Sequence, residues 1–256
     1  MGAEDEISED AILGGRLRIR QPLRGHRVGH DAVLLAAAAR AHAGQRAADL
    51  GAGVGAAGLA LAVRSAGLKV TLIEIDAALC ALANDNTRLN GLDDRVTVVA
   101  ADAGNVDALQ AAGLAPASFD CVLMNPPFFD ASRHNVSPDP RRRSAHVGSP
   151  DLLGHWVDTS AWLTKPAGML TLIWRADALN DVVAALRPGF GDISVLPVLP
   201  RAEAPAIRVL VSAVRGGGAS KVTYRPFVLN DNEGRPTPAA EAVLRSAAPL
   251  EFSERI

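Results

Sequence analysis

A short run near the middle of the chain ends a predicted strand with residues that could hold a planar nitrogen group. Residues 119–124 (FDCVLM) are apolar at nearly every position, which favours a strand covered on both faces in a parallel sheet. Asn125 follows, and then Pro126 and Pro127, which cannot donate to a sheet ladder and so end the strand. One side-chain amide, free carbonyls and the ring of Phe128 would form a rigid wall there. The alternative is an ordinary strand followed by a Pro-Pro loop.

A glycine-rich turn earlier in the chain predicts a cofactor loop. Residues 49–55 (DLGAGVG) lie between a predicted strand, 47–50, and a predicted helix, 57–65. Its glycines, Gly51, Gly53 and Gly55, permit a tight turn and a close approach of ligand to backbone. The spacing is GxGxG rather than the dinucleotide GxGxxG, and Asp49 precedes it. A carboxylate at this strand end would repel a pyrophosphate but attract an ammonium or a sulfonium-bearing amino acid.

Two further acids follow the next two predicted strands. Glu74 lies near the end of the strand 70–75, where it could accept hydrogen bonds from both ribose hydroxyls. Asp102 follows the strand 95–100 and could accept from an adenine amino group. Each acid alone would be typical of a solvated strand end. Together with Asp49 they outline a nucleoside with an amino-acid tail, which predicts S-adenosylmethionine as the cofactor; NAD is the weaker alternative.

The remaining patterned segments predict a doubly wound, mainly parallel α/β sheet. Helices are expected at 77–90, 107–112, 152–163 and 178–186, and they alternate with strands that include 119–124 and 169–174. The last two long strands, 193–199 and 207–214, are expected to form an antiparallel pair. We predict a single domain over residues 1–256, in which a glycine-rich loop at 216–220 precedes a short extension with one strand and one helix.

The start of the chain is expected to be less regular. Residues 1–11 are acidic and weakly patterned, so we expect a flexible lead-in. A short hairpin is expected around residues 17–23. An alanine-rich helix is predicted at 32–39, with Asp31 as its N-cap.

Composition limits the partners and the compartment. The formal net charge is −2, so a nucleic-acid partner would require a local basic surface. Two segments could supply one: Arg141, Arg142 and Arg143 in the first, and Arg16, Arg18, Arg20, Arg24 and Arg27 in the second. Runs of arginine are, however, usually solvated surface. Cys80 and Cys121 lack CxxC spacing and no apolar run reaches about 18 residues, so we expect free thiols, no membrane span and a cytoplasmic protein.

A metal site is not expected. His26 and His30 are four residues apart, a spacing that could bind a metal on a helix. Gly25 and Gly29 argue against a helix there, and no third ligand is near.

The sequence resembles the class I S-adenosylmethionine-dependent methyltransferases. DLGAGVG, LIEID, AAD and NPPF occur in the order and spacing of that superfamily. The resemblance implies a Rossmann-like fold with a seven-stranded sheet, and methyl transfer as the activity. Within the superfamily, Asn-Pro-Pro-Phe/Tyr after the fourth strand marks enzymes that methylate planar nitrogens: adenine N6, guanine N2 or the glutamine amide of release factors.

Residues from about 10 to about 246 further resemble the bacterial tRNA(Val) adenine-N6 methyltransferases. The similar stretches are 27–35 (RVGHDAVLL, against a family pattern of roughly VGTDAxLL), 125–129, and the arginine-rich segment 138–146. His30 stands where the family has threonine, and Phe128 where tyrosine is commoner. The resemblance implies tRNA as substrate. It also implies that the loop of Asp31 lies over the cofactor and target pocket, so Asp31 joins the expected cofactor site.

The expected mechanism is in-line methyl transfer to an exocyclic amine. The Asn125 side-chain oxygen and the Pro126 carbonyl would accept the amine's hydrogens and orient its lone pair, while Phe128 stacks on the base. Alternatives remain: guanine N2 of rRNA, a protein glutamine amide, a small-molecule O-methyltransferase, or a non-catalytic RNA-binding protein with the same fold. The glutamine enzymes carry an extra N-terminal helical domain and the guanine enzymes commonly duplicate the domain, and we expect neither here.

Overall fold

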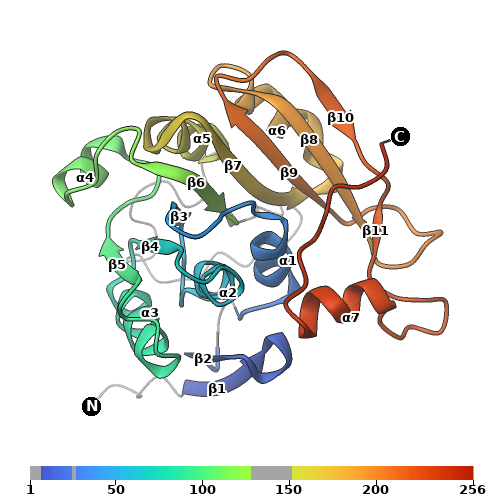
Figure 1. Cartoon of the computed structure of the whole chain (residues 1–256), viewed down its shortest axis with the longest axis horizontal. Coiled ribbons are helices and arrows are strands. Elements are labelled where there is room, and N and C mark those ends of the chain that lie inside the picture. The colour runs from blue at the N-terminus through green and yellow to red at the C-terminus, as the bar shows by residue number, and fades with distance from the viewer. Residues whose placement is uncertain (1–6, 25–26, 128–151, 256) are drawn as a thin grey trace.

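A mostly parallel sheet runs through the middle of the molecule (Figure 1). The computed structural model describes residues 7–24, 27–127 and 152–255. Five strands are parallel: β3 (Arg46–Leu50), β4 (Lys69–Glu74), β5 (Val96–Ala100), β6 (Phe119–Met124) and β7 (Thr164–Arg175). In the described residues the sheet has nine strands, in the order β10-β8-β9-β7-β6-β3-β4-β5, with β11 paired to β8 off this path. The predicted doubly wound sheet is confirmed.

The antiparallel part of the sheet lies at its C-terminal side. β9 (Arg208–Arg215) lies between β7 and β8 (Phe190–Leu199) and is antiparallel to both. This confirms the predicted antiparallel pair. The C-terminal extension adds two short strands where one was expected: β10 (Lys221–Thr223) and β11 (Phe227–Val228) each pair with β8 in parallel.

Helices cover both faces of the sheet. One layer contains α1 (His30–Ala38), α2 (Ala56–Arg64), α3 (Ala77–Leu89) and α7 (Pro238–Arg245), and the other contains α4 (Val106–Ala111), α5 (Leu152–Leu163) and α6 (Leu179–Leu186). Successive strand residues point to opposite faces, so Cys121 and Leu123 pack in the first layer while Val122 and Met124 pack in the second. This double burial explains why the strand is apolar at every position except Asp120.

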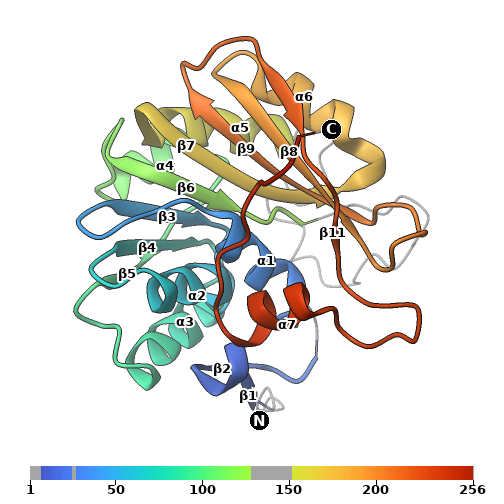
Figure 2. The same ribbon diagram turned by 45° about the vertical axis from the view of Figure 1, so that its right-hand side comes forward.

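The start of the chain forms more structure than its composition suggested. β1 (Ile7–Ile12) pairs antiparallel with β2 (Leu17–Pro22) through the 3-10 turn η1 (Leu13–Gly15), so the expectation of a flexible lead-in through residue 11 is wrong for residues 7–11. The acids that suggested disorder are paired: Glu9 binds Arg18 and Arg20 across the hairpin. Figures 1 and 2 show this hairpin at the bottom of the molecule.

Helix α1 begins earlier than predicted. Its N-cap is Gly29, in an extended conformation, and Asp31 lies in the first turn. The prediction that Asp31 is the N-cap is therefore wrong, because its carboxylate turns to a distant arginine. Residues 32–38 are all buried, which explains why α1 is apolar on every side. Figure 2 shows α7 beside α1.

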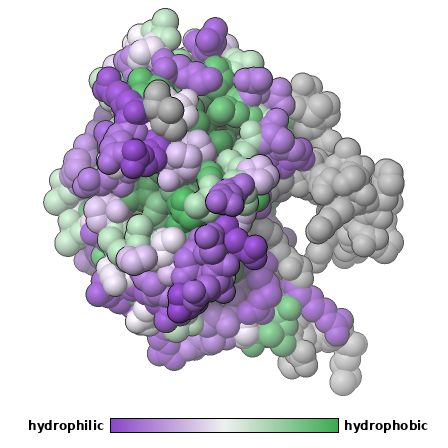
Figure 3. Space-filling model, turned by 90° about the vertical axis from the view of Figure 1, so that its right-hand side faces the viewer, coloured by the Kyte–Doolittle hydropathy of each residue, from purple (hydrophilic) through white to green (hydrophobic). Residues whose placement is uncertain are grey.

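Seen from the side of α7 and β11, the surface is mainly hydrophilic with separate hydrophobic areas (Figure 3). No helix in the described ranges combines the length and apolar character needed to cross a bilayer. Cys80 and Cys121 are both buried free thiols, and burial raises the pKa of Cys121 to about 12.

Candidate functional site

Strand register brings the glycine loop and the Asn-Pro-Pro segment to one edge of the sheet. β3 lies between β4 and β6, and Leu50 pairs with Ile73 on one side and Met124 on the other. Because these strands are parallel and end together, the next residues, Gly51 and Asn125, leave the sheet side by side.

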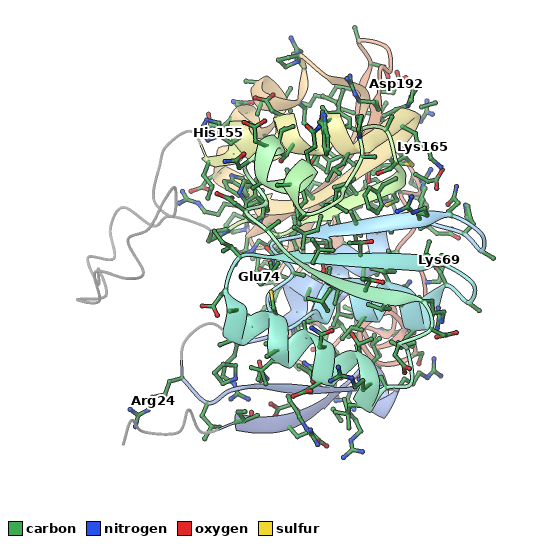
Figure 4. All side chains as sticks on the ribbon, turned by 90° about the vertical axis from the view of Figure 1, so that its left-hand side faces the viewer. Arg24, Lys69, Glu74, His155, Lys165 and Asp192 are labelled. Atoms are coloured by element: carbon green, nitrogen blue, oxygen red, sulfur yellow. The ribbon has the colours of Figure 1, made fainter. Side chains whose placement is uncertain are left out.

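The two later acids lie at the same edge. Glu74 ends β4 and pairs with Ala100 at the end of β5, two residues before Asp102. In Figure 4, Glu74 lies at one end of β4 and Lys69 at the opposite end of the same strand. The structure therefore brings the acids at the ends of β3, β4 and β5 to the carboxyl edge, where open α/β sheets bind ligands.

Asp49 is a buried carboxyl beneath the glycine loop. It is 2% exposed, and its Oδ2 accepts a hydrogen bond from the Gly58 N–H at 2.7 Å, in the first turn of α2. Burial raises the pKa of Asp49 to about 7; the Gly58 N–H opposes this shift, and the nearby charge of Glu74 adds to it. A ligand cation at this edge would favour the ionised form.

Glu74 connects two loops of the site. Its Oε2 accepts from the Gly53 N–H at 2.8 Å, and its Oε1 accepts from the N–H groups of Ile75 and Asp76 at 2.8 and 2.9 Å. The carboxylate is 7% exposed. It therefore holds the glycine loop against the end of β4, in addition to any contact with a ligand. All three loop glycines have positive φ: Gly51 (65°), Gly53 (58°) and Gly55 (90°).

Asn125 carries an unpaired acceptor. Its Oδ1 atom is buried and has no hydrogen-bond partner among the described residues. A buried polar atom without a partner costs about 1–3 kcal/mol, so an acceptor left unpaired at a ligand-binding edge indicates a site for a donor. Pro126 is buried and Pro127 is exposed. Phe128 lies outside the described residues, so its predicted stacking role stays a prediction.

Asp31 meets a residue that the sequence did not indicate. The Arg208 Nε atom donates to Asp31 Oδ2 at 2.9 Å, and both side chains are less than one-third exposed. Arg208 begins β9 and pairs with Arg175 at the end of β7, so it lies at the carboxyl edge. The two partners are 177 residues apart, and no local pattern links them.

The early arginines are largely engaged within the molecule. Arg18 and Arg20 bind Glu9, and Arg27 binds Asp10 at 2.7 Å. Arg16 donates to the Ser246 carbonyl at 2.6 Å. Arg24 has no hydrogen-bond or ion-pair partner within the described part of the chain. Figure 4 shows Arg24 on the same side of the molecule as Glu74. Three of the five arginines in this early segment are thus ion-paired. The arginines at 141–143 lie outside the described residues.

No metal cluster is present in the described residues: no three or more His, Cys, Asp or Glu side chains are placed together to hold an ion. His26, one of the pair at helical spacing, lies outside the described ranges.

Residues 26–138 match the family model described as the methyltransferase small domain. Curated relatives named tRNA1(Val) (adenine(37)-N6)-methyltransferase include one from Porphyromonas gingivalis, 33% identical over 160 residues, which are 61% of this chain and 61% of the relative. Another, from Serratia proteamaculans, is 31% identical over 198 residues, or 74% of this chain and 71% of the relative. The chain thus spans less than two thirds of the Porphyromonas relative and more than two thirds of the Serratia relative.

Solved structures of similar fold include a predicted O-methyltransferase from Agrobacterium tumefaciens. Its TM-score is 0.70 at 29% identity, with 83% of this chain and 94% of that chain covered. A putative transferase from Pyrococcus horikoshii has a TM-score of 0.56 at 14% identity, with 83% and 73% covered, and shows likeness of fold alone. The predicted Rossmann-like fold is confirmed.

Proposed function

The chain belongs to the methyltransferase small domain family of S-adenosylmethionine-dependent methyltransferases, and on that premise we propose that it methylates an exocyclic amino nitrogen. Adenine N6 in tRNA is the favoured acceptor. The observation that carries the proposal is the unpaired, buried Oδ1 atom of Asn125 beside the glycine loop. An amino group carries N–H donors, which can supply the hydrogen bond that this oxygen does not receive from the protein.

The residues at the carboxyl edge fit S-adenosylmethionine. We assign Asp49 to the ammonium end, the loop glycines to the backbone approach, Glu74 to the ribose and Asp102 to the adenine amino group. We also assign Asp31 to this site, which its ion pair with Arg208 at the same edge supports. When bound, the cofactor supplies a methyl group activated by the sulfonium charge.

The acceptor amine would be oriented by Asn125 and Pro126. An exocyclic amine is a poor nucleophile because its lone pair is delocalised into the ring. Two acceptors on its N–H groups, the Asn125 oxygen and the Pro126 carbonyl, would hold the lone pair toward the methyl group and stabilise the charge that grows on nitrogen. Pro126 and Pro127 keep that carbonyl free of sheet pairing. The methylated nitrogen then loses an acidic proton, so no strong general base is required.

An RNA substrate is supported by the names of the curated relatives and by the low cost of bringing a base from an RNA loop into the site. A base in an RNA loop is already partly unstacked, which lowers the cost of bringing it to the edge of the sheet. The ion pairs of Arg18, Arg20 and Arg27 are largely exposed to solvent, so each is individually weak. Phosphates can therefore compete for these arginines. A tRNA substrate would also imply a cytoplasmic location.

A second candidate is O-methylation, because the Agrobacterium protein of similar structure is described as a predicted O-methyltransferase. A hydroxyl has one hydrogen to donate, whereas the Asn125 oxygen and the Pro126 carbonyl are two acceptors. The pair of acceptors favours an amino group.

The acceptor can be identified directly. The protein is incubated with labelled S-adenosylmethionine in four separate reactions, each with one candidate acceptor: unmodified tRNA, rRNA, a release-factor protein or a small catechol. The products are identified by mass spectrometry. We expect N6-methyladenosine in tRNA alone. Label at guanine N2, at a glutamine amide or on oxygen would replace the proposed substrate, and no label in any sample would favour a non-catalytic RNA-binding protein.

A further inference from the structure

Trp156, in the second turn of α5, lies against both loops that carry the proposed cofactor residues. We infer that its indole forms the apolar wall of the adenine subsite. The inference rests on the proposed function for the identity of the cofactor, and it assigns to the site a residue from an element that the sequence motifs do not include.

The six-membered ring of Trp156 abuts the first loop. Gly51 has a φ of 65°, and a Cβ atom placed on it would lie 2.8 Å from Trp156 Cζ3, 3.3 Å from Cζ2 and closer still to Cη2. Any side chain at this position would therefore collide with the indole. The glycine that opens the cofactor loop is required by the ring that covers it, as well as by its backbone conformation.

The opposite edge of the same indole reaches the loop after β5. A Cβ atom on Gly104 would lie 3.3 Å from Trp156 Cδ1, 3.4 Å from Nε1 and 3.5 Å from Asp102 Oδ1. The pyrrole edge and the Asp102 carboxylate therefore face the same small space. Asp102 is itself fixed there, because its Oδ1 accepts from the Gly104 N–H at 2.9 Å.

The position of the indole is fixed by its helix. Thr159, one turn further along α5, donates from Oγ1 to the Ala103 carbonyl at 2.7 Å and is 1% exposed. This bond ties α5 to the loop that holds Asp102. Figure 4 shows His155, the residue before Trp156, on the same side of the molecule as Glu74.

The indole thus runs from the loop after β3 to the loop after β5, past the end of β4. Glu74 ends β4 and is the proposed ribose partner, and Asp102 is the proposed partner of the adenine amino group. An apolar ring beside the Asp102 carboxylate has the chemistry that a purine ring requires. Trp156 is 8% exposed, so the core and the two loops enclose nearly all of its surface. A purely structural tryptophan would not respond to adenine.

Intrinsic fluorescence can separate these roles. Wild type, Trp156→Phe and Trp162→Phe are each titrated with S-adenosylhomocysteine, with adenosine and with methionine, and binding is measured in parallel by calorimetry. Trp162 is the matched control, because it lies on the same helix at the end remote from Gly51, next to the N–H of Ala117 that bonds its carbonyl. Circular dichroism checks that each variant is folded.

We expect emission to change with S-adenosylhomocysteine and adenosine, and not with methionine, in wild type and Trp162→Phe. The change should vanish in Trp156→Phe. In Trp156→Leu the dissociation constant for S-adenosylhomocysteine should rise about 5- to 150-fold, the range given by base–aromatic stacking.

Two results would overturn the inference while leaving the proposed function intact: calorimetric binding of S-adenosylhomocysteine without any change in wild-type emission, or an emission change that persists in Trp156→Phe. If wild type does not bind S-adenosylhomocysteine at all, the proposed function fails and the adenine subsite fails with it.

Discussion

The ionisation of Asp49 should control cofactor affinity near neutral pH. Its carboxyl is 2% exposed, and burial raises its pKa to about 7, so the group changes charge in the range where an enzyme of this kind would work. The proposed ligand group is an ammonium, which only the ionised carboxylate attracts. Affinity should therefore increase as pH rises through about 7.

The size of the effect follows from the ionised fraction. A carboxyl with a pKa of about 7 is roughly one-tenth ionised at pH 6 and roughly nine-tenths ionised at pH 8. When a ligand binds only one form of a site, its apparent dissociation constant equals the intrinsic constant divided by the fraction of that form. The dissociation constant for S-adenosylhomocysteine should thus be about tenfold higher at pH 6 than at pH 8.

Calorimetry between these pH values tests the prediction, with Asp49→Asn as the matched variant. Asparagine keeps the acceptor for the Gly58 N–H but is neutral at every pH. The variant should bind more than about tenfold more weakly than wild type at pH 8 and show a flat profile. A flat wild-type profile, or a slope retained in Asp49→Asn, would refute the reasoning.

The same carboxyl makes a prediction about stability. Because the folded-state pKa of Asp49 is raised above its usual value of 3.8, its contribution to stability is fully present below that value and is lost as pH rises through about 7. Wild type should therefore lose Tm relative to Asp49→Asn between pH 5 and pH 8. A constant difference in Tm over that range would contradict the raised pKa.

Three further perturbations probe the contacts around the site. Glu74→Gln replaces one acceptor oxygen by a donor, so the dissociation constant for S-adenosylhomocysteine should rise about tenfold by calorimetry; an unchanged value would remove Glu74 from the site. Arg208→Met and Asp31→Asn are combined in a double-mutant cycle of thermal unfolding. For this partly exposed pair we expect a coupling free energy of about 0.2–1 kcal/mol. Additive losses of unfolding free energy would show that the pair contributes nothing. Gly51→Ala in the wild-type background should abolish detectable cofactor binding. In the Trp156→Phe background, which lacks the colliding ring atoms, the same substitution should weaken binding less. Equal loss of binding in both backgrounds would leave backbone strain as the whole cause.

The sequence predicted the parts of the fold that depend on local pattern. The strand Phe119–Met124 and the helix Leu152–Leu163 were predicted with the bounds observed, because a continuous apolar run and a helical periodicity each have clear ends. The edge of the site was predictable for a related reason. Acids that directly follow parallel strands must meet at one edge, whatever the packing elsewhere.

Long-range contacts could not be predicted in this way. Asp31 was assigned as an N-cap because its local sequence permits that role, while its partner Arg208 lies 177 residues further along the chain. Trp156 reads as an ordinary core residue of an amphipathic helix, and only the approach of α5 to the loops of Gly51 and Gly104 gives it another role. The strand Ile7–Ile12 was missed because its acids are neutralised by a strand that follows it.

The acceptor clamp is tested most directly by the rate of methyl transfer in Asn125→Ala, measured on tRNA in a single turnover. Asn84→Ala is the control, an asparagine on α3 whose amide bonds within its own helix. Asn125→Ala should lose about 10²- to 10³-fold in rate while binding S-adenosylhomocysteine as tightly as wild type, and Asn84→Ala should retain the wild-type rate. A wild-type rate in Asn125→Ala would contradict the assignment of this oxygen to the acceptor amine.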